Sequence, residues 1–536
     1  MSALLSACGG GGGSGADNPA PITPAPGSAV TDREAARFLH QAALAATDAD
    51  IARVKVLGYS GWLDEQLSLP RTQSHYDWMI AKGYQSDPNN ANNFQGADNT
   101  LWRKLMSSPD TLRQRVVLAL SEIFVVSMGG LPVPWRGFCV AAYVDLLEEN
   151  AFGTYRSLLN AITLSTGMGN YLNMRGSQKE DPRTGREPDE NYARELLQLF
   201  SLGLYQLNID GTVKTDAAGR PQETYTQSMI SGLAKVFTGW DYTQFNRSDP
   251  AFQRLPMSLN AGQHSGSDKS FLGITISGGT PGEQALQTAL DTIAGHSNVG
   301  PFIGRQLIQR LVTSNPTPAY VGRVAAVFDN NGQGVRGDLK AVVKAVLLDG
   351  EARADPAAHP AGWGKLREPA LRFVQWARTF GVTSPTDIWN IGDTSDPSRR
   401  LGQSPLRSPS VFNFFRPGYV PPNTSLGAQG LVAPEFQITN ESSVVAYANF
   451  MQTAIQSGVG EVKGTYGGWL AQANDAPTLV SRIALLMSAG QLSTATLSTI
   501  STAVAGIAAS SDVSRLNRIY AAILLIMVAP EYVVQK

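Results

Sequence analysis

The chain has 536 residues, with 43 Lys and Arg against 44 Asp and Glu and only two cysteines, a composition that excludes a small disulfide scaffold. The net charge of −1 is spread without long blocks of either sign, so the sequence gives no basic stripe of the kind that binds nucleic acids. Hydrophobic residues make up 43% of the chain, but the longest apolar run, near residues 520–530, is shorter than the roughly 20 residues of a membrane-spanning helix.

The first 30 residues have the composition of a leader and tether. Cys8 follows LLSA and precedes a stretch rich in glycine, serine and proline, which resembles the cleavage site of a bacterial lipoprotein. This interpretation predicts lipid attachment at Cys8, contact with a membrane through that anchor alone, and an exported protein located in the periplasm or at the outer membrane. The alternative is an incidental cysteine, because the apolar stretch before Cys8 is shorter than a signal h-region.

Apolar residues spaced three and four apart recur from about residue 31, and this spacing predicts a mainly α fold. The first helix begins near Thr31, the second ends before Pro70, and a helix pair is separated at Pro109, with Asp110 as the expected N-cap. Short extended pieces at 205–214 and 271–277 predict a minor β-hairpin and a lid. Further helices are expected at 143–164, 191–204, 226–237, 283–292, 300–311, 318–328, 339–348, 369–380, 442–457, 476–487 and 512–527.

Residues 31–536 are expected to form one large multi-helix globular body. Within it, prolines, serines and aromatic residues gather at 384–440. A loop of this length is usually functional or disordered, but the aromatic residues at 412–419 favour burial, so we expect an ordered loop that wraps the body. This loop leads to the C-terminal helices of 441–536.

The most polar helix is expected over 188–208, where Pro188 fits a helix start and Asp189 and Glu190 fit the first turn. Apolar residues occupy much of its circumference, which predicts a largely buried helix. Glu190 is spaced to pair with Arg194 one turn later. The remaining polar side chains form a narrow stripe: Asn191, Arg194, Glu195 and Gln198.

Two interpretations of this stripe are open. In the first it is the wall of an active-site pocket, with Glu195 as acid or base, Arg194 as an anion clamp and Glu190 beside them, while Asp189 and Asn191 contact substrate. In the second the same charges form an internal ion-pair network that ties helices together.

Standard catalytic and metal-binding motifs are missing from the sequence. The five histidines are never three or four residues apart, and there is no HExxH or CxxC, so we expect no metal site; the cofactor, if any, is unknown. The sequence also lacks GxSxG and the P-loop pattern. Trp240, next to Asp241 and Tyr242, fits either a sugar-stacking platform or the edge of the core.

Many segments, in order, carry a family resemblance, among them LRQRVVLALSEIFVVS, PDENYARELLQLFSLGLYQL, KLREP, PSVFNFFRPGY and PEYVVQK. They resemble the bacterial "domain of unknown function 1800" family from about residue 31 to the end of the chain. The resemblance implies export, and a gene neighbour that encodes a sulfatase-like partner of the "domain of unknown function 1501" family. Many relatives carry an FWHNHF-type segment where this chain has LSEIFVVS with Glu122, so any metal or catalytic chemistry of that segment is not implied here.

Two functional hypotheses follow. The first is an exported enzyme or enzyme subunit that acts on an extracellular or cell-envelope polymer, with His296 and Arg416 as a second wall facing the 189–195 stripe. The second is a noncatalytic binding or assembly protein that docks an exported partner.

Overall fold

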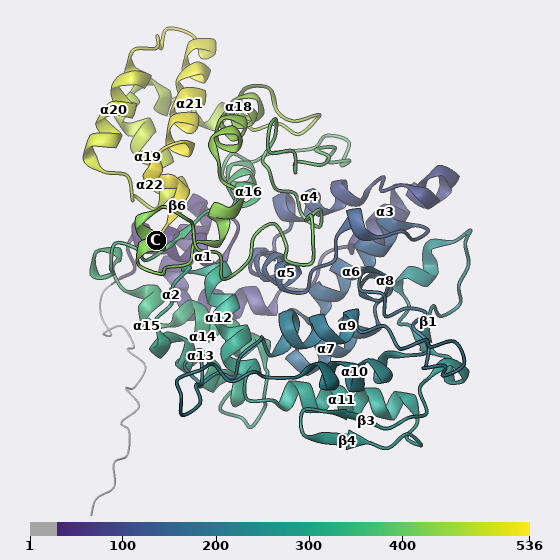
Figure 1. The fold of residues 1–536 in the computed structure, drawn as a ribbon. Helices are drawn as coiled ribbons and strands as arrows, with labels where there is room; N and C mark the ends of the chain where they lie inside the picture. The colour runs from purple at the N-terminus through teal and green to yellow at the C-terminus, as the bar shows by residue number, and fades with distance from the viewer. Residues whose placement is uncertain (1–28) are drawn as a thin grey trace, which may run out of the picture.

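Helices account for nearly all regular structure in the computed structural model, which describes residues 29–536 (Figure 1). The strands there are two or three residues long and form only two-stranded antiparallel sheets. The prediction of a mainly α fold is therefore confirmed.

The N-terminal helices begin where the sequence provides caps. Thr31 and Thr47 each form a capping box, with Glu34 and Asp50 respectively, and Gly58 bends the second helix with a φ of 69°. The helices are α1 (Asp32–Ala42), α2 (Asp48–Ser68), α3 (His75–Ala81), α4 (Ala97–Ser107), α5 (Thr111–Ile123), α6 (Arg136–Asn150), α7 (Tyr155–Leu164) and α8 (Thr166–Tyr171).

The middle of the chain alternates helices with small hairpins (Figure 1). The helices are α9 (Asn191–Glu195), α10 (Gln227–Ala234), α11 (Gly282–Gly295), α12 (Val299–Leu311), α13 (Pro318–Asp329), α14 (Leu339–Leu348) and α15 (Gly350–Arg353). The strands are β1 (Trp240–Asp241) with β2 (Ser258–Leu259), and β3 (Lys269–Phe271) with β4 (Ile274–Ile276).

The last helices are α16 (Pro369–Thr379), α17 (Ser425–Ala428), α18 (Glu441–Ser457), α19 (Ala476–Ser488), α20 (Thr494–Ala505), α21 (Asp512–Met527) and α22 (Pro530–Val533). Of these, α18, α19, α20 and α21 gather at one end of the molecule, at the top of Figure 1. The chain then returns to the body, because β6 (Val534–Gln535) pairs with β5 (Lys365–Leu366).

Buried apolar side chains form two large clusters. The first is built mainly from α1, α2 and α4–α14, and the second mainly from α16, α18, α19 and α21, while α3 belongs to a smaller third cluster. The two meet along α4, where Leu101 belongs to the first cluster and Trp102 to the second. The face of α4 thus joins the C-terminal helices to the rest.

Three local expectations need correction. The helix expected at 143–164 is two helices, since α6 ends at Asn150 and α7 starts at Tyr155. Asp110 occupies the N-cap position of α5 as expected, but its side chain makes no capping hydrogen bond; it accepts hydrogen bonds from Ser108 and Gln114 instead. The helix expected at 191–204 ends at Ser201, and its second half, Leu196–Ser201, is a π-helix.

The loop at 384–440 is ordered along the body. Phe415 is buried, and the guanidinium of Arg407 makes two hydrogen bonds of 2.6 and 2.7 Å with the carboxylate of Asp98 on α4. Among the described residues, no helix combines the length and apolar character that a membrane span needs.

Candidate functional site

A polar cleft of about 480 Å³ lies between α3, α6, α7, α8 and the short turn Pro250–Arg254. The charged side chains at its rim are paired: Arg71 Nη2 lies 2.6 Å from Glu149 Oε1, and Arg254 Nη1 lies 3.1 Å from Asp77 Oδ1. Uncharged hydrogen-bonding side chains complete much of the lining: Ser74, Tyr76, Tyr143, Asn150, Asn160, Ser165, Thr166 and Gln253.

Asp145 of α6 brings a further carboxylate to this cleft. Its two oxygens accept the backbone N–H groups of His75 and Tyr76 at 2.7 and 2.9 Å, so Asp145 also holds the first turn of α3. Burial raises the pKa of Asp145, although the charge of His75 and the two backbone hydrogen bonds oppose that rise.

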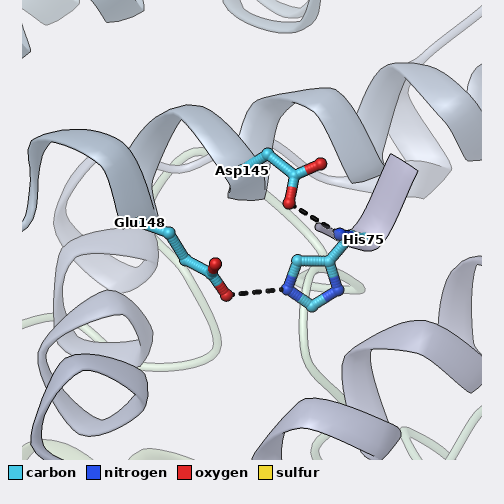
Figure 2. A group of neighbouring side chains, drawn as sticks. All are labelled: His75, Asp145 and Glu148. Atoms are coloured by element: carbon cyan, nitrogen blue, oxygen red, sulfur yellow. Dashed lines mark hydrogen bonds and ion pairs between the residues drawn. The ribbon is translucent and has the colours of Figure 1, made fainter. Parts of the chain in front are cut away.

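His75 and Glu148 form a buried pair next to Asp145 (Figure 2). His75 Nε2 lies 3.2 Å from Glu148 Oε1, and the Lys104 ammonium lies 2.5 Å from Glu148 Oε2. Burial by itself raises the pKa of Glu148, but the hydrogen bond and charge of His75, together with Lys104, outweigh it and lower that pKa to about 2. Glu148 is therefore an ionised group that its neighbours hold in place.

Neighbouring polar side chains complete this cluster. The Gln114 amide donates to Glu148 Oε1 at 3.0 Å, and His75 Nδ1 lies 3.1 Å from the Thr100 hydroxyl. These contacts fix the orientation of the imidazole and of the carboxylate. Neither His75 nor Glu148 lines the cleft, so Asp145 is the member of the group that meets it.

The ligand atoms of His75, Asp145 and Glu148 lie within 4.8 Å of one another, a spacing at which one imidazole and two carboxylates can hold a divalent cation. However, the Lys104 ammonium already contacts one Glu148 oxygen, and both Asp145 oxygens accept backbone hydrogen bonds. A cation would have to displace these donors. The geometry therefore fits an ion-pair network better than a metal centre.

Sequence reasoning missed this group because His75 lies 70 residues before Asp145. One local signal was available: Asp145 and Glu148 are acids inside the otherwise apolar pattern of 143–148. A carboxylate at such a position needs a buried partner, but the sequence does not say which residue supplies it.

In the predicted 189–195 stripe, Glu190 is the centre of a hydrogen-bond network. Its carboxylate lies 3.0 Å from Arg194 Nη2, which confirms the expected pairing one turn apart. The same carboxylate accepts hydrogen bonds from Gln227 at 2.7 Å and from Ser231 at 2.6 Å, both on α10. Glu190 therefore ties α9 to α10, the contact that the internal-network interpretation describes.

Glu195 differs from its neighbours in the stripe. Burial raises its pKa, Arg194 opposes that rise, and one carboxylate oxygen is buried without a hydrogen-bond partner in the described chain. A raised pKa and an unsatisfied oxygen are features of a functional carboxyl group as well as of a strained structural one. The role of Glu195 as acid or base stays a prediction.

The other predicted contact residues lie in separate surroundings. Trp240 is 3% exposed and its indole N–H donates to Val236 O, so its ring packs in the core. His296 accepts the backbone N–H of Asn298, and the exposed Arg416 lies over the ring of Phe412 at 4.5 Å. Within residues 29–536 no hydrogen bond or ion pair joins Trp240, His296 or Arg416 to the residues of the stripe.

Asp189 and Asn191 lie at the start of α9, where the Asp189 carboxylate accepts a hydrogen bond from the backbone N–H of Asn191. Cys8, the predicted lipidation site, lies outside the described residues.

A family model described as "Protein of unknown function (DUF1800)" matches residues 37–534, nearly the whole chain. The chain belongs to the DUF1800 family. No curated protein and no solved structure matches it.

In this DUF1800 chain, segments that carried the resemblance meet in a second buried charged cluster. Lys365, from KLREP, lies 3.0 Å from Glu435 and 3.4 Å from Glu368, measured from its ammonium to their carboxylate oxygens. Arg310 of α12 lies 3.4 Å from Glu122 of α5. All five side chains are buried, so the cluster joins four distant segments inside the protein.

Two of the carboxylates in this cluster share a hydrogen bond. Burial, followed by the charge and the hydrogen bond of Glu368, raises the pKa of Glu122 well above its ordinary value. For Glu368, burial alone raises the pKa, but the charge of Lys365 and the hydrogen bond from Glu122 outweigh it and lower the pKa to about 2. Of the two carboxyl groups, Glu122 therefore favours the protonated form, which can donate the shared hydrogen bond to Glu368.

Proposed function

We propose that this DUF1800 protein is an exported bacterial protein that binds a hydroxyl-rich segment of an extracellular or cell-envelope polymer in the cleft beside α6. The observation that carries the proposal is the lining of that cleft, in which hydroxyl, amide and paired charged side chains surround about 480 Å³. A volume of this size matches common ligand sites.

The charge of the cleft favours a neutral polymer over a polyanion. Its two arginines, Arg71 and Arg254, face three carboxylates, and both arginines are already paired across the rim. Sugar hydroxyls both donate and accept hydrogen bonds, which suits a wall of amides, hydroxyls and carboxylates. A polyanion would meet no unpaired arginine among these lining residues.

Asp145 is the side chain through which this cleft would act as an enzyme. A carboxyl group with a raised pKa, placed against a ligand, can give or take a proton. The rival catalytic proposal places that role on Glu195, with Glu190 and Arg194 beside it. An assay of product formation from an envelope polymer separates the two catalytic proposals. Loss of activity in Asp145→Asn but not in Glu195→Gln favours the cleft, and loss in Glu195→Gln but not in Asp145→Asn favours the stripe.

Binding tests the proposal more directly. Calorimetry with a panel of neutral and uronic-acid oligosaccharides should detect binding of a neutral member, and Arg254→Ala, which removes a rim side chain lying 4.6 Å over the Tyr76 ring, should weaken it at least fivefold. Arg220→Ala is the matched control, since it removes an exposed arginine that is also paired with an aspartate but lies outside the cleft. Equal affinity in the two variants, or no binding to any member, would contradict the proposal.

The location of the protein is part of the same proposal. Cys8 would carry a lipid anchor at the periplasmic face of a membrane or at the outer membrane, with the Gly/Ser/Pro-rich stretch as a tether. Cell fractionation of the wild type and of Cys8→Ala tests it: the substitution should move the protein from the membrane fraction to the soluble fraction.

A second candidate function, docking of an exported sulfatase-like partner, is favoured by one surface feature. The hairpin that follows the π-helix exposes large apolar side chains close together: Leu204 (50%), Tyr205 (42%), Ile209 (53%) and Val213 (43%). Exposed apolar groups gathered in one element are typical of a protein contact. Co-purification with the partner should fail in Ile209→Ser with Val213→Ser and persist in Val56→Ser, an exposed valine on α2.

A further inference from the structure

Three buried arginines line one small cavity. They are Arg115 of α5, Arg367 just before α16 and Arg372 in the first turn of α16, and they are 1%, 6% and 7% exposed. The cavity has a volume of about 20 Å³, and no carboxylate lines it. Its wall consists of His40, Ala43, Leu44, Arg115, Lys365, Arg367, Leu371, Arg372, Gln375 and Gln535.

None of the three arginines has an ion-pair partner among the described residues. Arg115 donates from one Nη to the Arg310 carbonyl, Arg367 contacts His40 Nδ1 at 3.3 Å, and the Arg372 guanidinium lies 3.9 Å from the centre of the Tyr447 ring. The Nε atom of each of the three is buried without a hydrogen-bond partner in residues 29–536. A buried guanidinium with unused donors is a costly group, which an anion would satisfy.

The neighbouring carboxylates are committed elsewhere. Glu368 and Glu435 contact Lys365, and Glu122 contacts Arg310, so they act on Arg115 only over longer distances. Five cations, the three arginines with Arg310 and Lys365, therefore face three carboxylates. The region holds an excess of positive charge.

The other polar groups of the wall do not offset this excess. Burial, together with the charge of Arg367, lowers the pKa of His40 well below its usual value, so its imidazole is neutral. The Gln375 and Gln535 amides donate to the carbonyls of Met487 and Leu311. Burial also lowers the pKa of Arg367 to about 10, which still leaves that guanidinium charged at pH 7.

We infer that this cavity is a binding site for one small monovalent anion of the size of chloride, held by Arg115, Arg367 and Arg372. The volume selects the size, because a space of this order holds a single water-sized particle and is too small for phosphate. The anion would join α1, α5 and α16, and so fasten the start of the C-terminal helices to the N-terminal helices.

Diffraction from bromide-soaked crystals of the protein tests the site directly. Bromide replaces chloride and scatters anomalously, so a peak is expected between the three guanidinium groups. A cavity with water density and no anomalous peak would overturn the inference.

Thermal unfolding of the full chain gives an independent test. When gluconate replaces chloride at constant ionic strength, the midpoint temperature of unfolding should fall. At chloride concentrations well above the dissociation constant of the site, each tenfold rise in chloride should lower the apparent equilibrium constant of unfolding about tenfold. A midpoint that is the same in both salts would refute the site.

A matched pair of variants separates anion binding from the loss of a buried arginine. Arg372→Met removes a proposed ligand and should abolish the chloride dependence. Arg378→Met removes a partly buried arginine of the same helix, which donates hydrogen bonds to the carbonyls of Lys104, Leu105 and Ser108. This variant should lower the midpoint but keep the chloride dependence. Equal chloride dependence in both variants would contradict the assignment of Arg372.

Discussion

Replacing Lys104 by methionine should destabilise the protein strongly through Glu148. Both side chains are 1% exposed, and their charged atoms are 2.5 Å apart. The substitution removes the ammonium and leaves the carboxylate buried with only His75 and Gln114 as partners. Breaking a buried pair in this way costs about 3–5 kcal/mol of unfolding free energy.

The pKa of Glu148 reflects all of its partners together, His75 first and then Lys104. Its fall from 4.5 to about 2 corresponds to roughly 3 kcal/mol of preferential stabilisation of the carboxylate in the folded state. Because the folded-state pKa is the lower one, this stability is fully present above pH 4.5 and is lost as the pH falls toward 2. Acid unfolding of Glu148→Gln should therefore depend less on pH in that window than unfolding of the wild type.

Urea denaturation followed by tryptophan fluorescence measures these effects. The surface pair Lys55–Asp32, with a similar distance of 2.7 Å but side chains 43% and 46% exposed, is the matched control, and Lys55→Met should cost less than about 1 kcal/mol. The double variant Lys104→Met with Glu148→Gln should recover at least half of the loss, since no buried charge is left unpaired. A loss below about 1 kcal/mol in Lys104→Met, or no recovery in the double variant, would refute the reasoning.

Two other substitutions test the packing. Gly232→Ala on α10 should cost about 1–3 kcal/mol by urea denaturation, because an added Cβ would overlap the Ser270 carbonyl of β3, whereas Gly295→Ala has open space and serves as the control. Arg407→Ala should release the loop at 384–440 from Asp98, and limited proteolysis within it should speed up roughly fivefold to thirtyfold if the pair contributes about 1–2 kcal/mol. Arg399→Ala, an exposed arginine of the same loop, should leave the cleavage rate unchanged, and an equal rate in both variants would contradict the anchoring role.

The helices were largely readable from the sequence because their signals are local. The patterns at 339–348 and 512–527 correspond to α14 and α21 with the same bounds. Apolar spacing and capping residues act within a few positions of each other. The π-helix after Glu195 had no clear local signal. The break between α6 and α7 is marked locally by Gly153 and by Thr154, which caps α7, but the sequence reasoning did not use these residues.

The charged pairs of the candidate sites also differ in how far they could be predicted from the sequence. The Glu190–Arg194 pair lies one turn apart and was predicted from spacing alone. The pairing of His75 with Glu148, and the meeting of Arg115 with Arg367, join residues far apart in sequence, and nothing local distinguishes these side chains from surface charges.

The sequence by itself thus determined a mainly α protein of the DUF1800 family and the position of most of its helices. Only the tertiary structure decided which charges are buried together, where the polar cleft opens and which arginines lack a carboxylate. The physical reason is that a buried charge is satisfied by whichever segment packs against it, and that choice is made by the packing of the whole chain.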